Sequence, residues 1–234
     1  MPDNESIAAF RSSYRQTLIG PHYRGWLHFA FTLCMTSVTI IACAWQLHHV
    51  SWAELATVPL TFLYANFAEY FGHRGPMHHP RRGLRLIFER HARQHHRFFT
   101  HESMAFDSSR DFKAVLFPPI LVTFFLVAFG TPVALFLAWI ATPNVAYLFA
   151  LTGTAYFLNY ELLHFAYHLP REHAVSRVPG MRVLRRHHTL HHDPALMTHY
   201  NFNITYPLAD WMLGTLRHQA PYASADPGQA RRMG

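Results

Sequence analysis

Four long apolar runs alternate with polar stretches along this chain, and each run has the length and composition of a helix in a bilayer. The first run carries no charged residue and has a tryptophan near each end, Trp26 and Trp45. A transmembrane helix needs about 20 mainly apolar residues, and aromatic residues gather at the membrane surface. The pattern therefore predicts an all-α integral membrane protein with four transmembrane helices, at about residues 26–47, 55–72, 114–129 and 133–165.

The breaks between these runs predict where the chain turns. Gly130-Thr131-Pro132 is expected to form a tight turn between the third and fourth spans, and Thr142-Pro143-Asn144 is expected to break the long fourth run. We predict a single membrane domain over residues 25–218. A polar N-terminal segment, 1–24, precedes it, and a disordered tail, 219–234, follows it.

The basic residues sort the connecting segments to one side of the membrane. The chain has a formal net charge of +7. Arginines crowd into the N-terminal segment and two polar blocks, 73–113 and 169–218, whereas the short connectors 48–54 and 130–132 carry none. By the positive-inside rule, both termini and both polar blocks are expected on the cytoplasmic side. Membrane orientation explains this charge, so we do not expect nucleic acid as a partner.

Histidine gives the polar blocks their chemistry. The chain has 20 histidines, many of them in four clusters that fall on the expected cytoplasmic side. Neutral imidazole is the commonest metal ligand in proteins, and ten imidazoles fit two ions better than one tetrahedral zinc, which takes four ligands. We therefore predict a cytosolic helical cap that carries a dimetal site, with these candidate ligands: His73, His78, His91, His95, His96, His164, His168, His188, His191 and His192.

The spacing within the clusters indicates that helices present these side chains. Three histidines of the last cluster stand at i, i+3 and i+4 on one helix face: His188, His191 and His192. Two pairs are four residues apart and are expected to share a face in the same way: His91 with His95, and His164 with His168. His73 and His78 lie about 140° apart on an α-helix, which favours a helix end that turns into a loop.

Polar residues close to the clusters are candidates to hold the histidines in place. A ligating histidine usually donates its other ring N–H to a carboxylate or a carbonyl oxygen. Seven residues could accept or relay such bonds: Glu69, Asp107, Asp111, Glu161, Asn201, Asn203 and His187. Two alternatives stay open. Asp111 could instead cap the third helix. His187 could replace His188 as a ligand, because it stands four residues before His191.

Three of the clusters, in order, resemble the histidine boxes of the fatty acid hydroxylase superfamily. The matching pieces are His73-x4-His78, His91-x3-His95-His96 and His188-x2-His191-His192. The stretch from Tyr160 to His168 resembles the further histidine pair on the last span of the fatty acid 2-hydroxylase branch, and residues 201–215 resemble the closing segment of many members. Sterol desaturases, sterol methyl oxidases and carotenoid hydroxylases belong to the same superfamily of membrane oxygenases.

The resemblance implies an oxidoreductase with two iron ions and O2 as co-substrate. Its substrate would be a lipid from the bilayer, of which one C–H bond is hydroxylated or, in some members, desaturated. The resemblance also implies that zinc can occupy the same positions in purified protein. No part of the sequence matches a fused cytochrome b5 domain, so we expect a separate electron donor of cytochrome b5 or ferredoxin type. Beyond the metal ligands, no further catalytic residue is predicted.

Other functions make different demands on the sequence. A metal transporter predicts ionisable or metal-binding residues at mid-span, and none of the four runs has a charge near its centre. A haem-binding electron carrier needs only two axial histidines. Cys34 and Cys43 lie in one apolar run without a CxxC motif, which excludes an iron–sulfur cluster. Hydroxylation and desaturation share the first C–H cleavage, so the sequence is compatible with both, and with a fatty acyl chain, sterol, sphingoid base or carotenoid.

Overall fold

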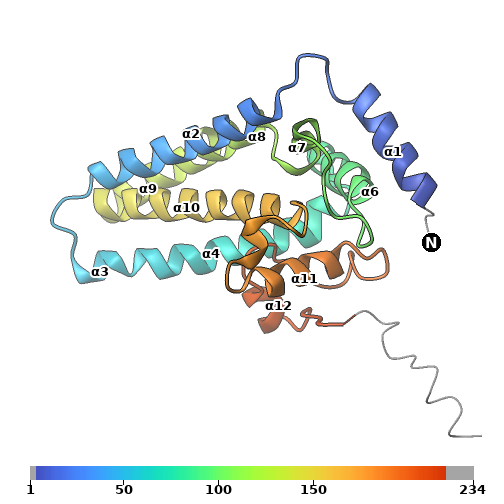
Figure 1. Cartoon of the computed structure of the whole chain (residues 1–234). Coiled ribbons are helices and arrows are strands. Elements are labelled where there is room, and N and C mark those ends of the chain that lie inside the picture. The colour runs from blue at the N-terminus through green and yellow to red at the C-terminus, as the bar shows by residue number, and fades with distance from the viewer. Residues whose placement is uncertain (1–3, 220–234) are drawn as a thin grey trace, which may run out of the picture.

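The chain forms a bundle of long helices with shorter helices gathered at one end (Figure 1). The structure is a computed structural model that describes residues 4–219, and within these residues it contains helices and no β-sheet. Four long helical segments form the bundle: α2 (Gly25–Trp45), α4 (Thr57–Gly72), the continuous helix α8 (Pro119–Thr123), η4 (Phe124–Gly130) and α9 (Thr131–Ile140), and α10 (Pro143–Tyr167). Because α10 contacts α2, α4 and α9, it lies at the centre. The prediction of an all-α fold is confirmed.

The two polar blocks fold together at the end of the bundle where α4 and α10 finish. This cap is built from short helices and the N-terminal helix: α1 (Asn4–Thr17), η1 (His73–Met77), α5 (Arg85–Phe88), η2 (Glu89–His95), α6 (His96–Phe98), η3 (Ser109–Asp111), α7 (Phe112–Val115), η5 (Ala174–Arg177), α11 (Met181–His191) and α12 (Leu208–Met212). At the opposite end, α3 (Trp52–Leu55) connects α2 to α4 (Figure 1). The predicted disordered tail lies outside the described residues, apart from Gln219.

Two of the long segments are long and apolar enough to cross a membrane, as judged within residues 4–219. They are Gly25–Trp45, with 21 residues, and Pro119–Ile140, with 22 residues. Their outward side chains support this, since Trp45 and Trp139 are more than 80% exposed on the bundle surface. Large apolar surfaces of this kind are unfavourable in water and favourable in lipid. The other two predicted spans, α4 and α10, do not pass the same test.

The predicted turn at residues 130–132 is wrong, because the helix continues through it. Proline has no N–H, so a proline inside an α-helix leaves a carbonyl without its donor. Here Pro132 follows the π-helical segment η4, and the Thr131 hydroxyl donates to the Leu126 carbonyl at 3.2 Å. The chain reverses one segment later, where Thr142 caps α10 by accepting the Val145 N–H at 3.2 Å. The third long helix therefore covers 119–140 instead of 114–129, and the break predicted at residues 142–144 is confirmed.

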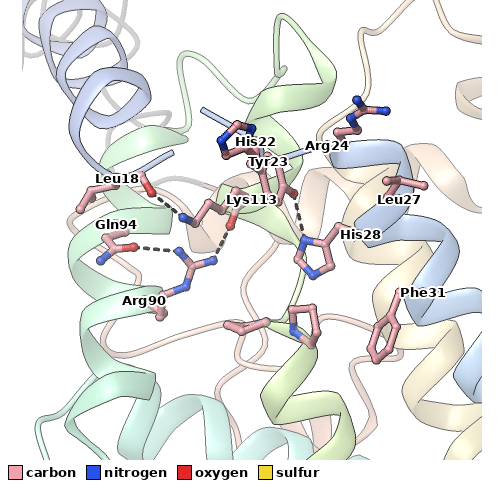
Figure 2. A pocket seen from close by; sticks show the side chains of 12 residues that line it. Leu18, His22, Tyr23, Arg24, Leu27, His28, Phe31, Arg90, Gln94 and Lys113 are labelled. Atoms are coloured by element: carbon pink, nitrogen blue, oxygen red, sulfur yellow. Dashed lines mark hydrogen bonds between the residues drawn. The ribbon is translucent and has the colours of Figure 1, made fainter. Parts of the chain in front are cut away.

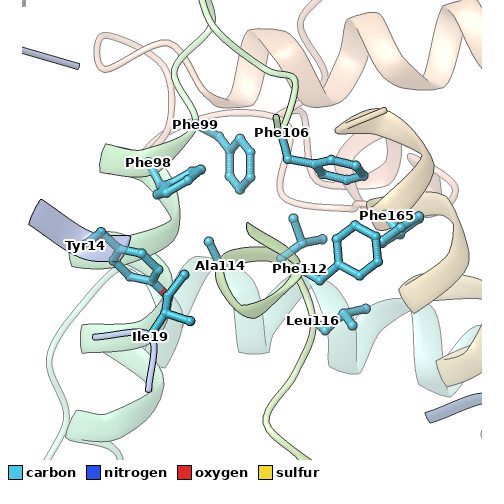
Figure 3. Close-up of a cluster of buried hydrophobic side chains, with 10 residues drawn as sticks. Tyr14, Ile19, Phe98, Phe99, Phe106, Phe112, Ala114, Leu116 and Phe165 are labelled. Atoms are coloured by element: carbon cyan, nitrogen blue, oxygen red, sulfur yellow. The ribbon is translucent and has the colours of Figure 1, made fainter. Parts of the chain in front are cut away.

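A cluster of buried aromatic side chains ties the cap to the bundle (Figure 3). Phe98 of α6 and Phe112 of α7 belong to this cluster together with Phe165 near the end of α10. The rings of Phe112 and Phe165 pack edge to face, with centroids 4.7 Å apart, and such a pair adds about 0.5–1.5 kcal/mol to the gain from burial. The cluster fixes the cap against the part of α10 that carries His164 and leads to His168.

Paired charges fasten α1 to the cap. The Arg15 guanidinium donates two hydrogen bonds of 2.8 Å to the Asp111 carboxylate and a third, of 2.6 Å, to Asp107. Arg11, one turn earlier, is buried and lies 3.7 Å from Asp107. Both carboxylates were predicted to support the metal ligands, whereas the structure pairs them with arginines of α1. The physical reason is that a guanidinium is a stronger partner for a carboxylate than a neutral imidazole is.

Replacing Asp111 with asparagine is expected to loosen α1. Burial opposes the charge of Asp111, but the Arg15 guanidinium and two backbone N–H groups outweigh it and lower the pKa of this carboxyl. The stabilisation is therefore present above the ordinary pKa of an aspartate and is lost as the pH falls through the lowered pKa. At neutral pH the variant should lose about 2 kcal/mol of unfolding free energy. The melting temperatures of the unmodified protein and the variant should converge as the pH falls from neutral to acid. A difference that persists in acid would show that the Asp111 carboxylate charge is not the source of the stabilisation.

Candidate metal centre

The structure brings all ten candidate histidines together in two buried groups. Within each group the potential ligand nitrogens lie within 4.8 Å of one another. The first group is His73, His78, His91, His96 and His191, and the second is His95, His164, His168, His188 and His192. They lie in η1, η2, α6, α10 and α11 or directly after these elements, which meet at the end of the bundle. Segments more than a hundred residues apart in the chain therefore supply one site.

Two π-helical segments decide which histidines of the first polar block face each other. In a π-helix the hydrogen bonds join residues five apart instead of four. His73 and His78 are five apart across η1, and so are His91 and His96 across η2, and both pairs enter the first group. His91 and His95 lie side by side as predicted, with stacked rings whose centroids are 5.2 Å apart. They belong to different groups, however, because His91 is in the first and His95 is in the second.

Helix α11 serves both groups. It is a regular α-helix, so His188 and His192, four residues apart, face the second group together. His191 belongs to the first group, so the helix face predicted to carry these three histidines supplies both groups. Where the groups meet, the rings of His96 and His192 are stacked with centroids 4.3 Å apart. The two groups are therefore neighbours within a single centre.

Backbone carbonyl oxygens fix the orientation of half of these rings. The Nδ1 atoms of His95, His168 and His192 lie 2.9, 2.8 and 2.7 Å from the carbonyl oxygens of Ala114, Met104 and Phe99. Two rings of the first group do the same: His191 to the Tyr200 carbonyl and His73 to the Phe202 carbonyl. A carbonyl oxygen can only accept, so each of these Nδ1 atoms carries the proton. The lone pair is then on Nε2, which points into the group.

The contact between His95 and His192 shows that these residues fit a metal. Their Nε2 atoms are 3.1 Å apart, and both rings carry their proton on the other nitrogen. Burial lowers the pKa of His95 to about 3 and that of His192 well below its ordinary value, so both imidazoles are neutral. Two lone pairs that face each other without a proton repel, and a cation between them removes the repulsion. Imidazole suits iron, zinc, copper and nickel alike, so the donor set fits a metal without selecting one.

The closing segment, residues 200–206, supplies two of the carbonyls, and predicted polar residues hold it in place. Glu69 accepts the backbone N–H of Thr205 at 2.9 Å and the Thr205 hydroxyl at 2.6 Å. The Asn203 amide donates to the Asn66 carbonyl at 3.0 Å, and His187 donates to the Asn203 carbonyl at 3.0 Å. These residues do not bond the clustered histidines directly. They position the backbone that does.

Of the other predicted residues, Asn201 has the same supporting role near the start of this segment. Asn201 joins the segment to Arg217, which donates its N–H to the Asn201 side chain at 2.7 Å. His187 points to the closing segment and belongs to neither group, so the alternative that it replaces His188 as a ligand is not supported by its position.

Asp210 is the anchor that the sequence reasoning missed. It is fully buried and accepts the N–H groups of Phe202 at 3.0 Å and Asn203 at 2.7 Å, together with the Thr215 hydroxyl at 2.6 Å. His187 lies 3.5 Å from the same carboxylate. The available signal was its place in the stretch 201–215, where a lone aspartate among apolar residues needs a partner.

Glu161 differs from the other buried carboxylates because it is only half satisfied. It lies on α10 one helical turn before His164 and is 2% exposed. One carboxylate oxygen accepts the Phe117 N–H at 3.2 Å, and the other has no hydrogen-bond partner within the described residues. Glu161 therefore orients the linker before α8 but does not support a histidine.

Glutamine substitutions should separate these two glutamates. Glu69→Gln places an NH2 group against the N–H and hydroxyl donors of the closing segment, so it should lower the unfolding free energy by about 2–3 kcal/mol. Glu161→Gln can keep its bond to Phe117 and should cost less than about 1 kcal/mol. Thermal unfolding of both variants in the same detergent provides the measurement. Equal destabilisation of the two variants would show that the hydrogen bonds of Glu69 to the closing segment do not stabilise the protein as described.

Comparison with known proteins identifies the family. The sequence model of the fatty acid hydroxylase family matches residues 58–215, a stretch that contains all ten clustered histidines. The chain belongs to this family. No curated protein and no solved structure matches the chain.

Membership of the family defines the class of chemistry. It implies an oxidoreductase, a lipid oxygenase of hydroxylase or desaturase type, and the two histidine groups fit the metal dependence of such enzymes. Family members are associated with membranes, in agreement with the two candidate spans.

Proposed function

We propose that the chain is a di-iron oxygenase that uses O2 to hydroxylate a C–H bond of a membrane lipid. The observation that carries the proposal is the pair of neighbouring five-histidine groups, buried and neutral, within the region matched by the family. Two adjacent sets of nitrogen donors suit two ions side by side. A bound pair of redox-active metal ions would supply the activation of O2 that attack on an unactivated C–H bond requires.

The chain positions the imidazole rings, keeps them neutral and excludes water from the metal centre. Carbonyl oxygens hold the rings of His95, His168 and His192 with Nε2 directed inward. Both groups are buried, so bulk water is kept from the reacting atoms and competing oxidations are limited. In the net reaction one oxygen atom enters the C–H bond and the other forms water, with two electrons and two protons from outside. We propose a separate cytochrome b5- or ferredoxin-type donor for these electrons.

We also propose that all four long segments cross the membrane and that the cap lies in the cytoplasm. The segment α10 packs against both candidate spans, and α4 packs against α10, so a bilayer that holds those spans would also surround α4 and α10. The short connector through α3 lacks arginine, whereas the cap carries many arginines, which agrees with the positive-inside rule. The metal centre would then lie at the membrane surface, where a lipid chain can reach it from the bilayer.

The direct test is oxygen incorporation. The purified chain, loaded with ferrous iron and supplied with a reductant and a lipid extract, is incubated under 18O2 and the lipids are analysed by mass spectrometry. We expect a lipid product that carries one 18O atom. A product that has lost two hydrogens without 18O would assign the chain to desaturation. If neither product forms with iron, although the protein binds metal and remains folded, the proposed function is wrong.

A further inference from the structure

A cavity of about 670 Å3 lies beside the first turn of α2, outside the two histidine groups (Figure 2). Its walls come from the segment between α1 and α2, from η2, and from the linker between α7 and α8. A volume of this size is typical of cavities that hold small molecules. Its position at the start of a candidate span places it at the level of the membrane surface.

One side of the cavity is strongly basic. Arg90, Lys113 and His22 line this side, Arg24 lies near Leu27 at the start of α2, and no carboxylate is among the lining residues. Within residues 4–219, Arg90 and Lys113 form no ion pair: their hydrogen bonds run to carbonyl oxygens and to neutral side chains such as Gln94. Elsewhere in the cap, arginines such as Arg15 are paired with carboxylates. The positive charge of this cavity is therefore available to an anion.

The opposite side of the cavity is apolar. Leu27 and Phe31 face it from α2, and Pro118 and Pro119 also line the cavity. Figure 2 shows Arg90 and Lys113 across the cavity from these two α2 residues. Leu27 is 64% exposed and lies on a candidate membrane span. An occupant thus meets cations at one end and hydrocarbon at the other, which is the polarity of an anionic amphiphile.

We propose that this cavity binds an anionic amphiphile from the bilayer, with its carboxylate or phosphate between Arg90 and Lys113 and its alkyl chain along Leu27 and Phe31. The inference goes beyond the proposed function, because it concerns binding and does not depend on whether the metal centre oxidises this molecule. A smaller cavity shares Arg90 and Pro118 with the larger one and reaches His95. The proposed site therefore shares part of its wall with a cavity that is lined by His95 of the second histidine group.

The position of Lys113 beside Arg90 also favours the binding of an anion in this cavity. Burial and the neighbouring Arg90 lower the pKa of Lys113, so the two cations disfavour one another in the empty cavity. An anion between them would relieve this repulsion and form charge-assisted hydrogen bonds with both groups. A neutral lipid of the same length would gain only the apolar contacts.

Electron paramagnetic resonance with a spin-labelled lipid can test this binding in the full chain. The protein is placed in phosphatidylcholine nanodiscs with 5-doxylstearate, at a pH at which its carboxylate is ionised, or with the methyl ester of the same acid. The fraction of immobilised label gives the relative affinity. We expect the acid to bind about tenfold more tightly than the ester, since only the ionised acid can form charge-assisted hydrogen bonds with Arg90 and Lys113.

Two variants and one competitor complete the test. Lys113→Gln keeps a donor for the Leu18 carbonyl but removes the charge, and it should bring the affinity for the acid close to that for the ester. The control Arg182→Gln removes one charge from an exposed position on α11 and should change neither affinity. Equal binding of acid and ester to the unmodified protein overturns the proposal, and so does an effect of Arg182→Gln equal to that of Lys113→Gln. If millimolar inorganic phosphate displaces the label, the site takes soluble anions and the amphiphile assignment is wrong.

Discussion

Replacing His95 with alanine is expected to remove the metal from the second histidine group and to abolish lipid oxidation. The Nε2 atom of His95 lies 3.1 Å from that of His192 and 3.2 Å from that of His164. It is therefore a central donor atom of this group. Loss of residues that merely orient metal ligands already costs about 10–100-fold, so loss of a ligand should reduce product formation by at least about 100-fold. Elemental analysis should show bound metal falling from about two ions per chain to about one.

His191→Ala should have the same effect through the first group, which makes the two variants a matched pair. The control is His79→Ala, because His79 is exposed, lies in neither group and has only the Arg74 carbonyl as a partner. This variant should keep its metal content and its activity. If His95→Ala and His191→Ala both retain the metal content and activity of the unmodified protein, the two groups are not the metal centre.

Asp210→Ala is expected to be the most damaging change among the residues that do not contact the histidine groups. Asp210 is fully buried, and its carboxylate accepts from Phe202, Asn203 and Thr215. Removing it leaves the two buried N–H groups of Phe202 and Asn203 without an acceptor, which should lower the unfolding free energy by about 3–5 kcal/mol. Thermal unfolding in detergent measures this loss.

The same variant should affect the two histidine groups unequally. The closing segment that Asp210 holds supplies the Tyr200 carbonyl to His191 and the Phe202 carbonyl to His73, and both rings belong to the first group. Metal should therefore be lost from this group first, at temperatures at which the chain is still folded. Asp107→Asn is a suitable control, because Asp107 is 62% exposed and pairs only with α1. Equal loss from both groups would show that Asp210 acts on overall stability alone.

Spacing along the chain was sufficient to find the ten candidate ligands. Clusters of histidine at helical intervals are rare, and they can be recognised without knowledge of the tertiary structure. Spacing was not sufficient to divide them. His91 and His95 both lie in η2 but belong to different groups, and so do His188 and His191 of α11. Whether a segment is α- or π-helical depends on hydrogen bonds that neighbouring elements stabilise, so five-residue and four-residue pairs cannot be told apart from the sequence.

The supporting residues were harder to assign, for a related reason. Glu69 and Asn203 do support the centre, but through the closing segment, whereas Asp107 and Asp111 hold α1. A carboxylate in an apolar stretch implies that it has a polar partner in the fold, but the sequence does not identify that partner. The main partners of the ligands are backbone carbonyl oxygens such as that of Ala114, and every residue has a carbonyl, so no residue type can mark them.

The sequence by itself determined that this protein is helical, that it has apolar helices of membrane length, and that it gathers a set of histidines suited to a metal centre. These properties follow from composition and from short-range periodicity. The tertiary structure alone decided how ten histidines divide into two groups, which nitrogen of each fixed ring faces inward, and that a basic cavity lies beside α2. Each of these depends on where segments far apart in the chain come to rest, because a hydrogen bond or a lone-pair contact forms only when two such segments hold their atoms about 3 Å apart.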